Sequence, residues 1–298
     1  MTEVLESFSQ ALAEAVKKAG TGVVQIDARR RLPASGIVWS NEGVLLTANH
    51  VVERDDRIEV QLADGSKIPA KLVGRDGTTD VAVLRLKAQD LSPLEWADLD
   101  ELSVGHLVLA LGRPRGDVMA SLGIVSKLGD GLQTRAGGRV EPALQTDLVM
   151  YPGFSGGALI DVSGRLLGMN TSAFLRGVSM AIPTRTLSRV VESLLTHGRV
   201  RRAYLGIGAQ PVRLPEDLAS AIGQDTGLLA VSVEPDSPAD QSGLLLGDVL
   251  LGLDGEKVTR LEELLSLLTD QRVEKKVPVS ILRAGEQVEL AVTLGERE

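Results

Sequence analysis

A serine flanked by glycines stands in the segment Gly153-Phe154-Ser155-Gly156-Gly157. Glycines leave the backbone unobstructed, so the amide N–H groups of such a loop can approach a reacting carbonyl and stabilise the oxyanion that forms on it. The segment also fits the G-x-S-x-G pattern of α/β-hydrolases, whose nucleophilic serine is followed by a helix. Here the chain after the serine leads into an expected strand. The sequence therefore predicts Ser155 as a nucleophile in a strand context.

Two residues that could activate Ser155 precede it in the chain. His50 ends one apolar run and Asp80 opens another, so each side chain would be held rigidly at the end of a strand. A carboxylate there can accept a hydrogen bond from the imidazole Nδ1 and fix the tautomer whose Nε2 faces the serine. The order His, Asp, Ser is that of two-barrel proteases and disfavours an esterase of the α/β-hydrolase type. We predict the triad His50, Asp80 and Ser155, with Asp76 as the weaker alternative acid.

The elements expected to position this triad are mostly strands. Between residues 22 and 183 the chain alternates short apolar runs with turn signals, and no helical pattern interrupts them. This texture is typical of an all-β barrel or sandwich. Amphipathic spacing predicts one helix over residues 2–18 and another from Thr184 that closes at Gly198.

The chain beyond Arg202 mixes strands with two helical patterns. One helix is expected to begin at Thr259, with Glu262 three residues later completing a capping box. Its apolar face would comprise Leu261, Leu264, Leu265 and Leu268. Because domains usually run about 100 to 200 residues, a chain of 298 residues fits two domains.

Composition excludes several kinds of function. The net charge of −8 argues against a nucleic-acid partner, which needs a basic face. The absence of cysteine excludes disulfides, zinc-thiolate sites and a thiol nucleophile, and the three scattered histidines predict no metal site. The N-terminus carries Glu3 and Glu6 where a secretory signal would be basic, and no run is long and apolar enough to span a membrane. We expect a cytoplasmic protein, although a chain trimmed of its signal would look the same.

Three blocks together resemble the active site of the HtrA (Deg) serine proteases. They occur in the family's order, and the resemblance covers nearly the whole chain from about Val23. The blocks are Thr47-Ala48-Asn49-His50-Val51-Val52, Thr79-Asp80-Val81-Ala82-Val83-Leu84 and Gly153-Phe154-Ser155-Gly156-Gly157-Ala158-Leu159.

The resemblance implies a double β-barrel of the chymotrypsin type with the site in the crevice between barrels. It also implies an oxyanion hole made by the backbone amides of Gly153, Phe154 and Ser155. The chain departs from the family at Phe154, where Asn or Asp is usual, and at Tyr151, where Asn is more frequent. Only the amide of Phe154 is needed for chemistry, so we expect activity to survive the change.

The same resemblance implies a specificity pocket for small or medium aliphatic P1 residues, because its walls offer no acidic base for Lys or Arg. The residues carried over to this pocket are Asn170, Thr171, Ser172, Val178 and Met180.

The C-terminal part resembles the PDZ domains of these proteases. The residues expected to bind a peptide's C-terminus here are Tyr204, Leu205, Gly206 and Ile207. The amides of the last three would hold the carboxylate, and the peptide would add as a strand beside Gly208 and Ala209. Leu261 and Leu265 would line the groove.

These observations predict a mostly β protein with three parts: an N-terminal helix (1–20), a trypsin-like protease domain (21–198) and a small α+β PDZ domain (203–298). The predicted function is an ATP-independent endopeptidase that cleaves unfolded or damaged proteins, needs no cofactor, and binds peptide C-termini. Family resemblance implies a homotrimer or higher oligomer. The alternative is a catalytically silent, PDZ-containing holdase or adaptor, its loop kept incompetent by Phe154 and Tyr151.

Overall fold

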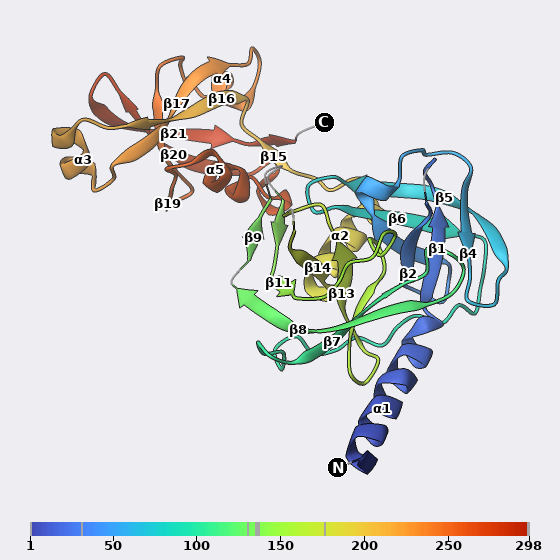
Figure 1. Cartoon of the computed structure of the whole chain (residues 1–298). Helices are drawn as coiled ribbons and strands as arrows, with labels where there is room; N and C mark the ends of the chain where they lie inside the picture. Colours follow the sequence, from blue (N-terminus) through green and yellow to red (C-terminus); the bar gives the residue numbers. More distant parts are fainter. Residues whose placement is uncertain (1, 31, 130, 135–137, 176, 297–298) are drawn as a thin grey trace. The chain divides into compact units, whose positions relative to one another are not determined.

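The computed structural model describes residues 2–30, 32–129, 131–134, 138–175 and 177–296 (Figure 1). By its internal contacts the chain divides into two units, residues 1–200 and 201–298. Each unit has its own buried apolar cluster, and each is described here by itself.

The first unit contains two closed antiparallel barrels of six strands each. The first has the strand order β1-β2-β3-β6-β5-β4 and the second β11-β14-β13-β12-β7-β8. The first barrel comprises β1 (Val23–Asp27), β2 (Ala34–Val38), β3 (Val44–Ala48), β4 (Ile58–Gln61), β5 (Lys67–Asp76) and β6 (Val81–Leu86), with a 3-10 turn η1 (Asn49–Val51) after β3. The second comprises β7 (Leu107–Gly112), β8 (Met119–Gly129), β11 (Ala143–Thr146), β12 (Ala158–Asp161), β13 (Leu166–Thr171) and β14 (Ser179–Pro183). A small hairpin of β9 (Leu132–Gln133) and β10 (Arg139–Val140) lies between β8 and β11 in sequence.

The barrels are filled by aliphatic side chains, as expected from a chain with only 2% aromatic residues. Every residue of β2 and β3 is buried, so these strands are covered on both faces. A fully buried Val, Leu or Ile side chain contributes about 1.5–3 kcal/mol relative to an exposed one. The rigid ends of such strands are where the predicted His50 and Asp80 lie.

Two helices flank the barrels in sequence. Helix α1 (Thr2–Gly20) buries Ala15, Ala19 and Gly20 near its C-terminal end. Helix α2 (Thr184–His197) ends where the sequence predicts: Gly198 adopts a φ of +72° and its amide donates to the Leu194 carbonyl.

The second unit is built on a sheet with the strand order β16-β17-β18-β20-β21, in which β16 lies at an edge. Its strands are β16 (Ile207–Arg213), β17 (Thr226–Val233), β18 (Val249–Leu253), β20 (Lys276–Arg283) and β21 (Glu286–Thr293). The short strand β19 (Glu256–Lys257) pairs with β18, and a separate two-stranded sheet joins β15 (Ala203–Tyr204) to β22 (Gly295–Glu296). The helical elements are α3 (Glu216–Ile222), α4 (Pro238–Gln241), α5 (Leu261–Leu267) and the 3-10 turn η2 (Asp270–Arg272).

Helix α5 begins later than the sequence predicts. Its N-cap is Arg260, and the capping carboxylate belongs to Glu263 in place of Glu262. Glu263 accepts hydrogen bonds from the amides of Thr259 and Arg260 and from the Thr259 hydroxyl. The sequence favours Thr259 with Glu262, because Thr and not Arg is a usual N-cap residue, so the predicted start of the helix is wrong by one residue or more.

The predicted fold class is confirmed: two β-barrels are followed by a small α+β domain. Within the described ranges, no helix has the length and apolar character that a membrane span requires, and no group of acidic or histidine side chains could hold a metal ion.

Glu263 generates a pH prediction for the second unit. Burial raises the pKa of its carboxyl, but hydrogen bonds from Thr259 and Arg260 outweigh burial and lower this pKa from 4.5 to about 2. The charged carboxylate therefore stabilises the fold above about pH 4.5, and this contribution is lost as the pH falls toward 2. We expect Glu263→Gln to lower the unfolding free energy of this unit by about 1–2 kcal/mol at pH 7 and by roughly half of that or less at pH 3.

Hydrogen exchange of amides in β18 and β20 of the full chain measures this free energy. Glu286→Gln, at an exposed site on β21, is the matched control. An equal loss at both pH values would contradict the role of the Glu263 charge.

Candidate active site

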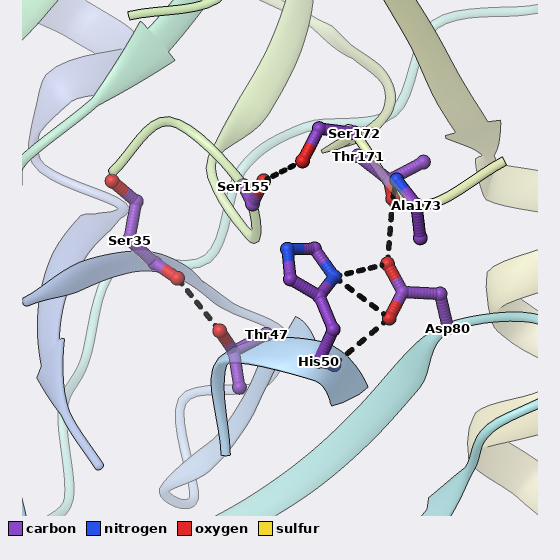
Figure 2. Close-up of polar contacts among 8 residues, drawn as sticks. All are labelled: Ser35, Thr47, His50, Asp80, Ser155, Thr171, Ser172 and Ala173. Atoms are coloured by element: carbon purple, nitrogen blue, oxygen red, sulfur yellow. Dashed lines mark hydrogen bonds and ion pairs between the residues drawn. The ribbon is translucent and has the colours of Figure 1, made fainter. Parts of the chain in front are cut away.

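Strand pairing brings His50 and Asp80 together. His50 lies in η1 directly after β3, Asp80 directly precedes β6, and β3 pairs with β6 through Ala48 and Val81. The His50 Nδ1 lies 3.0 and 2.9 Å from the two carboxylate oxygens of Asp80 (Figure 2). The His50 amide also donates to Asp80 Oδ1 at 2.9 Å. Because Nδ1 is held by the carboxylate, Nε2 is left to accept a proton, and it faces the loop that carries Ser155 (Figure 2).

Asp80 is held from both barrels. Its side chain is 3% exposed, and Thr171 at the end of β13 donates its hydroxyl to Asp80 Oδ2 at 2.5 Å. The carboxylate thus receives hydrogen bonds from the ring and amide of His50 and from Thr171. A buried carboxylate needs such donors because burial removes its hydration.

The alternative acid, Asp76, has a different set of partners. Its oxygens accept from the amide and hydroxyl of Thr78 and from the hydroxyl of Thr79. Asp76 therefore closes the turn that leads into Asp80, and the carboxylate bound to His50 is that of Asp80.

Ser155 is placed beside this pair, but its hydroxyl has another partner. The Ser155 Oγ lies 3.2 Å from the Ser172 Oγ (Figure 2), and among the described residues it makes no hydrogen bond with His50. Catalytic hydrogen bonds are often incomplete in a site without substrate. Proton transfer from Ser155 to His50 therefore requires the serine hydroxyl to turn away from Ser172.

The loop that carries Ser155, residues 151–157, is called the nucleophile loop here. It leaves two of the three expected oxyanion donors free. The Phe154 amide donates to the Tyr151 carbonyl at 3.0 Å, so it is not available to an oxyanion, contrary to the prediction. Within the described part of the chain, the amides of Gly153 and Ser155 have no protein acceptor. Gly153 has a φ of +90°, and a Cβ there would lie 2.4 Å from Pro114 and 2.8 Å from the Pro33 carbonyl oxygen. Only glycine fits this position.

The Phe154 side chain points into the second barrel and is fully buried. Its ring makes an edge contact with Tyr151, with centroids 5.4 Å apart. A Cβ on Gly112 would lie 2.6 Å from the Phe154 ring, so a glycine on β7 makes room for it. The unusual residue before Ser155 is thus an apolar anchor for the loop.

Two residues expected in the specificity pocket have their side chains engaged elsewhere. Asn170 is buried, and its amide nitrogen donates to the carbonyl oxygens of Ala158 and Leu111. Thr171 is buried, and its hydroxyl donates a hydrogen bond to Asp80 Oδ2. The side chains of these two residues support the site, and the expected place of Asn170, Thr171, Ser172, Val178 and Met180 in the specificity pocket stays a prediction. No sequence signal separated Thr171 from its neighbours, because its partner lies in the other barrel.

The expected carboxylate-binding loop of the second unit has two free donors. Among the described residues, the amides of Leu205 and Gly206 have no protein acceptor, and Ile207 begins the edge strand β16. The Tyr204 hydroxyl donates to the Glu234 carboxylate. In α5, Leu261 is exposed and Leu265 is half-buried.

Comparisons with known proteins agree with this architecture. The family model of the trypsin-like peptidase domain matches residues 34–169, and that of the PDZ domain matches residues 203–294. The chain is 38% identical over 271 residues to a probable periplasmic serine endoprotease, DegP-like, of Marinomonas sp. (strain MWYL1), covering 88% of this chain and 57% of that protein. A protein of the same description from Pseudomonas fulva (strain 12-X) is 36% identical over 298 residues, covering 97% of this chain and 61% of that protein. The chain spans about three fifths of the length of these curated relatives.

Two solved structures are similar over almost their whole length. The HtrA-type protease AlgW with a decapeptide superposes with a TM-score of 0.80 at 31% identity, covering 96% of this chain and 99% of that chain. The serine endoprotease from Yersinia pestis superposes with a TM-score of 0.79 at 32% identity, covering 96% and 98%.

The hydrogen bond from Thr171 to Asp80 can be tested by removing one hydroxyl. We expect Thr171→Val to slow the reaction of Ser155 with a fluorophosphonate about 10- to 100-fold, because a hydrogen bond to a charged group contributes ~1.5–3 kcal/mol. Thr171→Ser keeps the hydroxyl and should react within about threefold of wild type on the same grounds. Equal rates for the Val and Ser variants would refute this role.

Proposed function

This chain belongs to the HtrA/DegP-like family of trypsin-like serine proteases with a PDZ domain, and from that premise we propose that it is an endopeptidase with His50, Asp80 and Ser155 as its triad. The observation that carries the proposal is the contact of His50 Nδ1 with both carboxylate oxygens of Asp80, beside a loop with two free amides. A buried carboxylate paired with an imidazole that faces a serine is the arrangement that activates a hydroxyl nucleophile.

The proposed reaction is acyl transfer. His50 Nε2 takes the proton of Ser155 once the hydroxyl has turned from Ser172, and the oxygen attacks the peptide carbonyl. The amides of Gly153 and Ser155 hold the resulting oxyanion, and His50 returns the proton to the leaving amine. Water then hydrolyses the acyl-enzyme with His50 again as base. These groups supply every proton transfer without ATP or a cofactor.

We propose unfolded or damaged polypeptides as substrates and peptide C-termini as ligands of the PDZ domain. A C-terminal carboxylate would bind the free amides of Leu205 and Gly206, and the peptide would extend the sheet at β16. One solved relative was determined with a decapeptide, which supports peptide binding in the family.

The preference for small or medium aliphatic P1 residues also stays a proposal. Ser172, Val178 and Met180 carry no charge that would pair with a basic P1 side chain, and a peptide-library profile measures the preference directly.

One observation bears on the alternative of a silent binding protein. The Ser155 hydroxyl contacts Ser172 and makes no hydrogen bond with His50 among the described residues, and an inactive site would share this arrangement with a resting one. The reason first expected for silence is not supported at Phe154, because its bulky side chain is fully buried and packs in the core of the second barrel.

The compartment is not fixed by these observations. The curated relatives are named as periplasmic proteins, so the cytoplasmic location expected from the sequence is not confirmed. Fractionation of cells that produce the full-length protein distinguishes the two locations.

Fluorophosphonate labelling tests the proposed function. We expect the wild-type chain to be labelled and to degrade casein, and both Ser155→Ala and His50→Ala to lose these activities by at least about 10³-fold. Addition of a peptide with a free apolar C-terminus should raise the labelling rate if PDZ occupancy activates the site.

Matched controls distinguish the two candidate functions. The same peptide with an amidated C-terminus should have no effect, because it lacks the carboxylate. A wild-type chain that binds the free peptide but is never labelled would support the silent adaptor and overturn the protease.

We also propose a homotrimer or higher oligomer that involves α1, whose Val4, Leu5 and Phe8 are exposed in the single chain. Light scattering at micromolar concentration should give at least three times the mass of one chain, and removal of residues 2–9 should lower it. A monomeric mass for the intact chain would contradict the proposal.

A further inference from the structure

A buried hydroxyl from the first barrel reaches the nucleophile loop of the second. Ser35, on β2, is completely buried, and its Oγ lies 2.7 Å from the Gly153 carbonyl oxygen. On its other side, the same Oγ accepts a hydrogen bond from the Arg113 amide at 2.8 Å. Because the Arg113 amide already donates to this oxygen, the single hydrogen of the Ser35 hydroxyl is directed to Gly153.

The backbone amide and carbonyl of Ser35 also form hydrogen bonds near Ser155. Its amide donates to the Ser155 carbonyl at 3.3 Å, and its carbonyl accepts from the Thr47 hydroxyl at 2.7 Å (Figure 2). A Cβ on Gly156 would lie 2.2 Å from the Ser35 carbonyl oxygen, so β2 and the loop are in direct backbone contact. Ser35 therefore holds the loop both at the nucleophile and two residues before it.

The contact with Gly153 fixes the peptide unit between the two oxyanion donors. That unit joins Gly153 to Phe154: its carbonyl is bound by Ser35, and its N–H is bound by the Tyr151 carbonyl. The free amide of Gly153 lies on one side of this unit and that of Ser155 on the other. If the unit lost its carbonyl partner it could rotate, and the directions of both flanking N–H groups would change.

The Arg113 amide that donates to Ser35 Oγ is itself held in place. The Arg113 guanidinium is buried and donates to the carbonyls of Gly20, Val23 and Gly116 at 2.7–2.8 Å. Burial lowers the pKa of this guanidinium, which has no hydrogen-bonded carboxylate among the described residues. The Arg113 backbone is thus anchored by three carbonyls and presents its amide to Ser35 in a fixed direction.

We propose that Ser35 is a positioning residue for the oxyanion hole, which it keeps open by binding the Gly153 carbonyl; this inference rests on the proposed serine protease function. Ser35 does not touch the reacting atoms. Its effect is on the stabilisation of the tetrahedral intermediate and not on substrate binding, because the loop and not the substrate-binding surface is what it holds.

The test is a kinetic comparison of Ser35→Ala with a matched control. Ser40→Ala is suitable because the Ser40 Oγ, at the end of the same hairpin, is buried without a partner among the described residues. We expect Ser35→Ala to lower kcat on a peptide substrate about 10- to 100-fold with KM within about twofold of wild type, and Ser40→Ala to change neither.

A second readout separates positioning from a loss of folding. The affinity for a peptidyl trifluoromethyl ketone, which forms a tetrahedral oxyanion adduct on Ser155, should fall in parallel with kcat. The affinity for the corresponding peptidyl alcohol, which forms no oxyanion, should stay unchanged. If Ser35→Ala does not fold, Ser35→Cys keeps a donor, although a weaker one on a slightly larger side chain, and should show a smaller loss of the same kind.

Two results would overturn the inference. One is an active wild type whose Ser35→Ala or Ser35→Cys variant keeps the kcat and the ketone affinity of Ser40→Ala. The other is a loss that falls equally on the ketone and the alcohol, which would indicate general disruption. A wild type that never turns over substrate or binds the ketone would instead overturn the proposed protease function, and this role of Ser35 with it.

Discussion

The burial of the Asp80 carboxylate is the constraint on which the site depends. A charged group removed from water must receive hydrogen bonds from the protein, and here the donors come from His50 in the first barrel and Thr171 in the second. The carboxylate can therefore be satisfied only when the two barrels are packed together. Because Asp80 also binds the ring of His50, the packing of the two barrels helps to fix the orientation of that ring.

The nucleophile loop depends on close backbone contacts, one with β2 across the same interface and one with β7 within the second barrel. A Cβ on Gly156 would meet the Ser35 carbonyl at 2.2 Å, and one on Gly157 would meet the Leu111 carbonyl at 2.1 Å. These glycines let the loop lie directly against β2 and β7, where the carbonyl and amide groups of neighbouring strands hold its peptide units. Phe154 adds an apolar anchor in the second barrel, so the loop is held by packing as well as by hydrogen bonds. Such a loop can present free N–H groups without the local structure collapsing onto them.

Some parts of the site are already in the arrangement that catalysis would need, and one is not. The His50 and Asp80 pair is formed, and the amides of Gly153 and Ser155 are free, but the Ser155 hydroxyl is engaged with Ser172. A serine side chain changes rotamer on a much faster timescale than backbone segments rearrange. The step from this resting arrangement to a competent one is thus a rotation of one hydroxyl, with the slower backbone elements already in position.

The sequence by itself predicted a serine nucleophile preceded by a histidine and an aspartate, a mostly β first part and the end of helix α2, because glycine placement, strand texture and a helix stop signal are local patterns. The double barrel and the PDZ domain followed from the resemblance of short blocks to a family. Only the tertiary structure assigned Thr171 to Asp80, Ser35 to Gly153 and the Phe154 side chain to the barrel core. The partners in each case are far apart in sequence, so no local pattern marks the contact. The start of α5 was predicted wrongly for a different reason: Thr259 with Glu262 fits the capping-box pattern, but the carboxylate that binds the amides of Thr259 and Arg260 is that of Glu263. The sequence predicts the reacting groups, whereas the hydrogen bonds that orient them form only when the two barrels pack together.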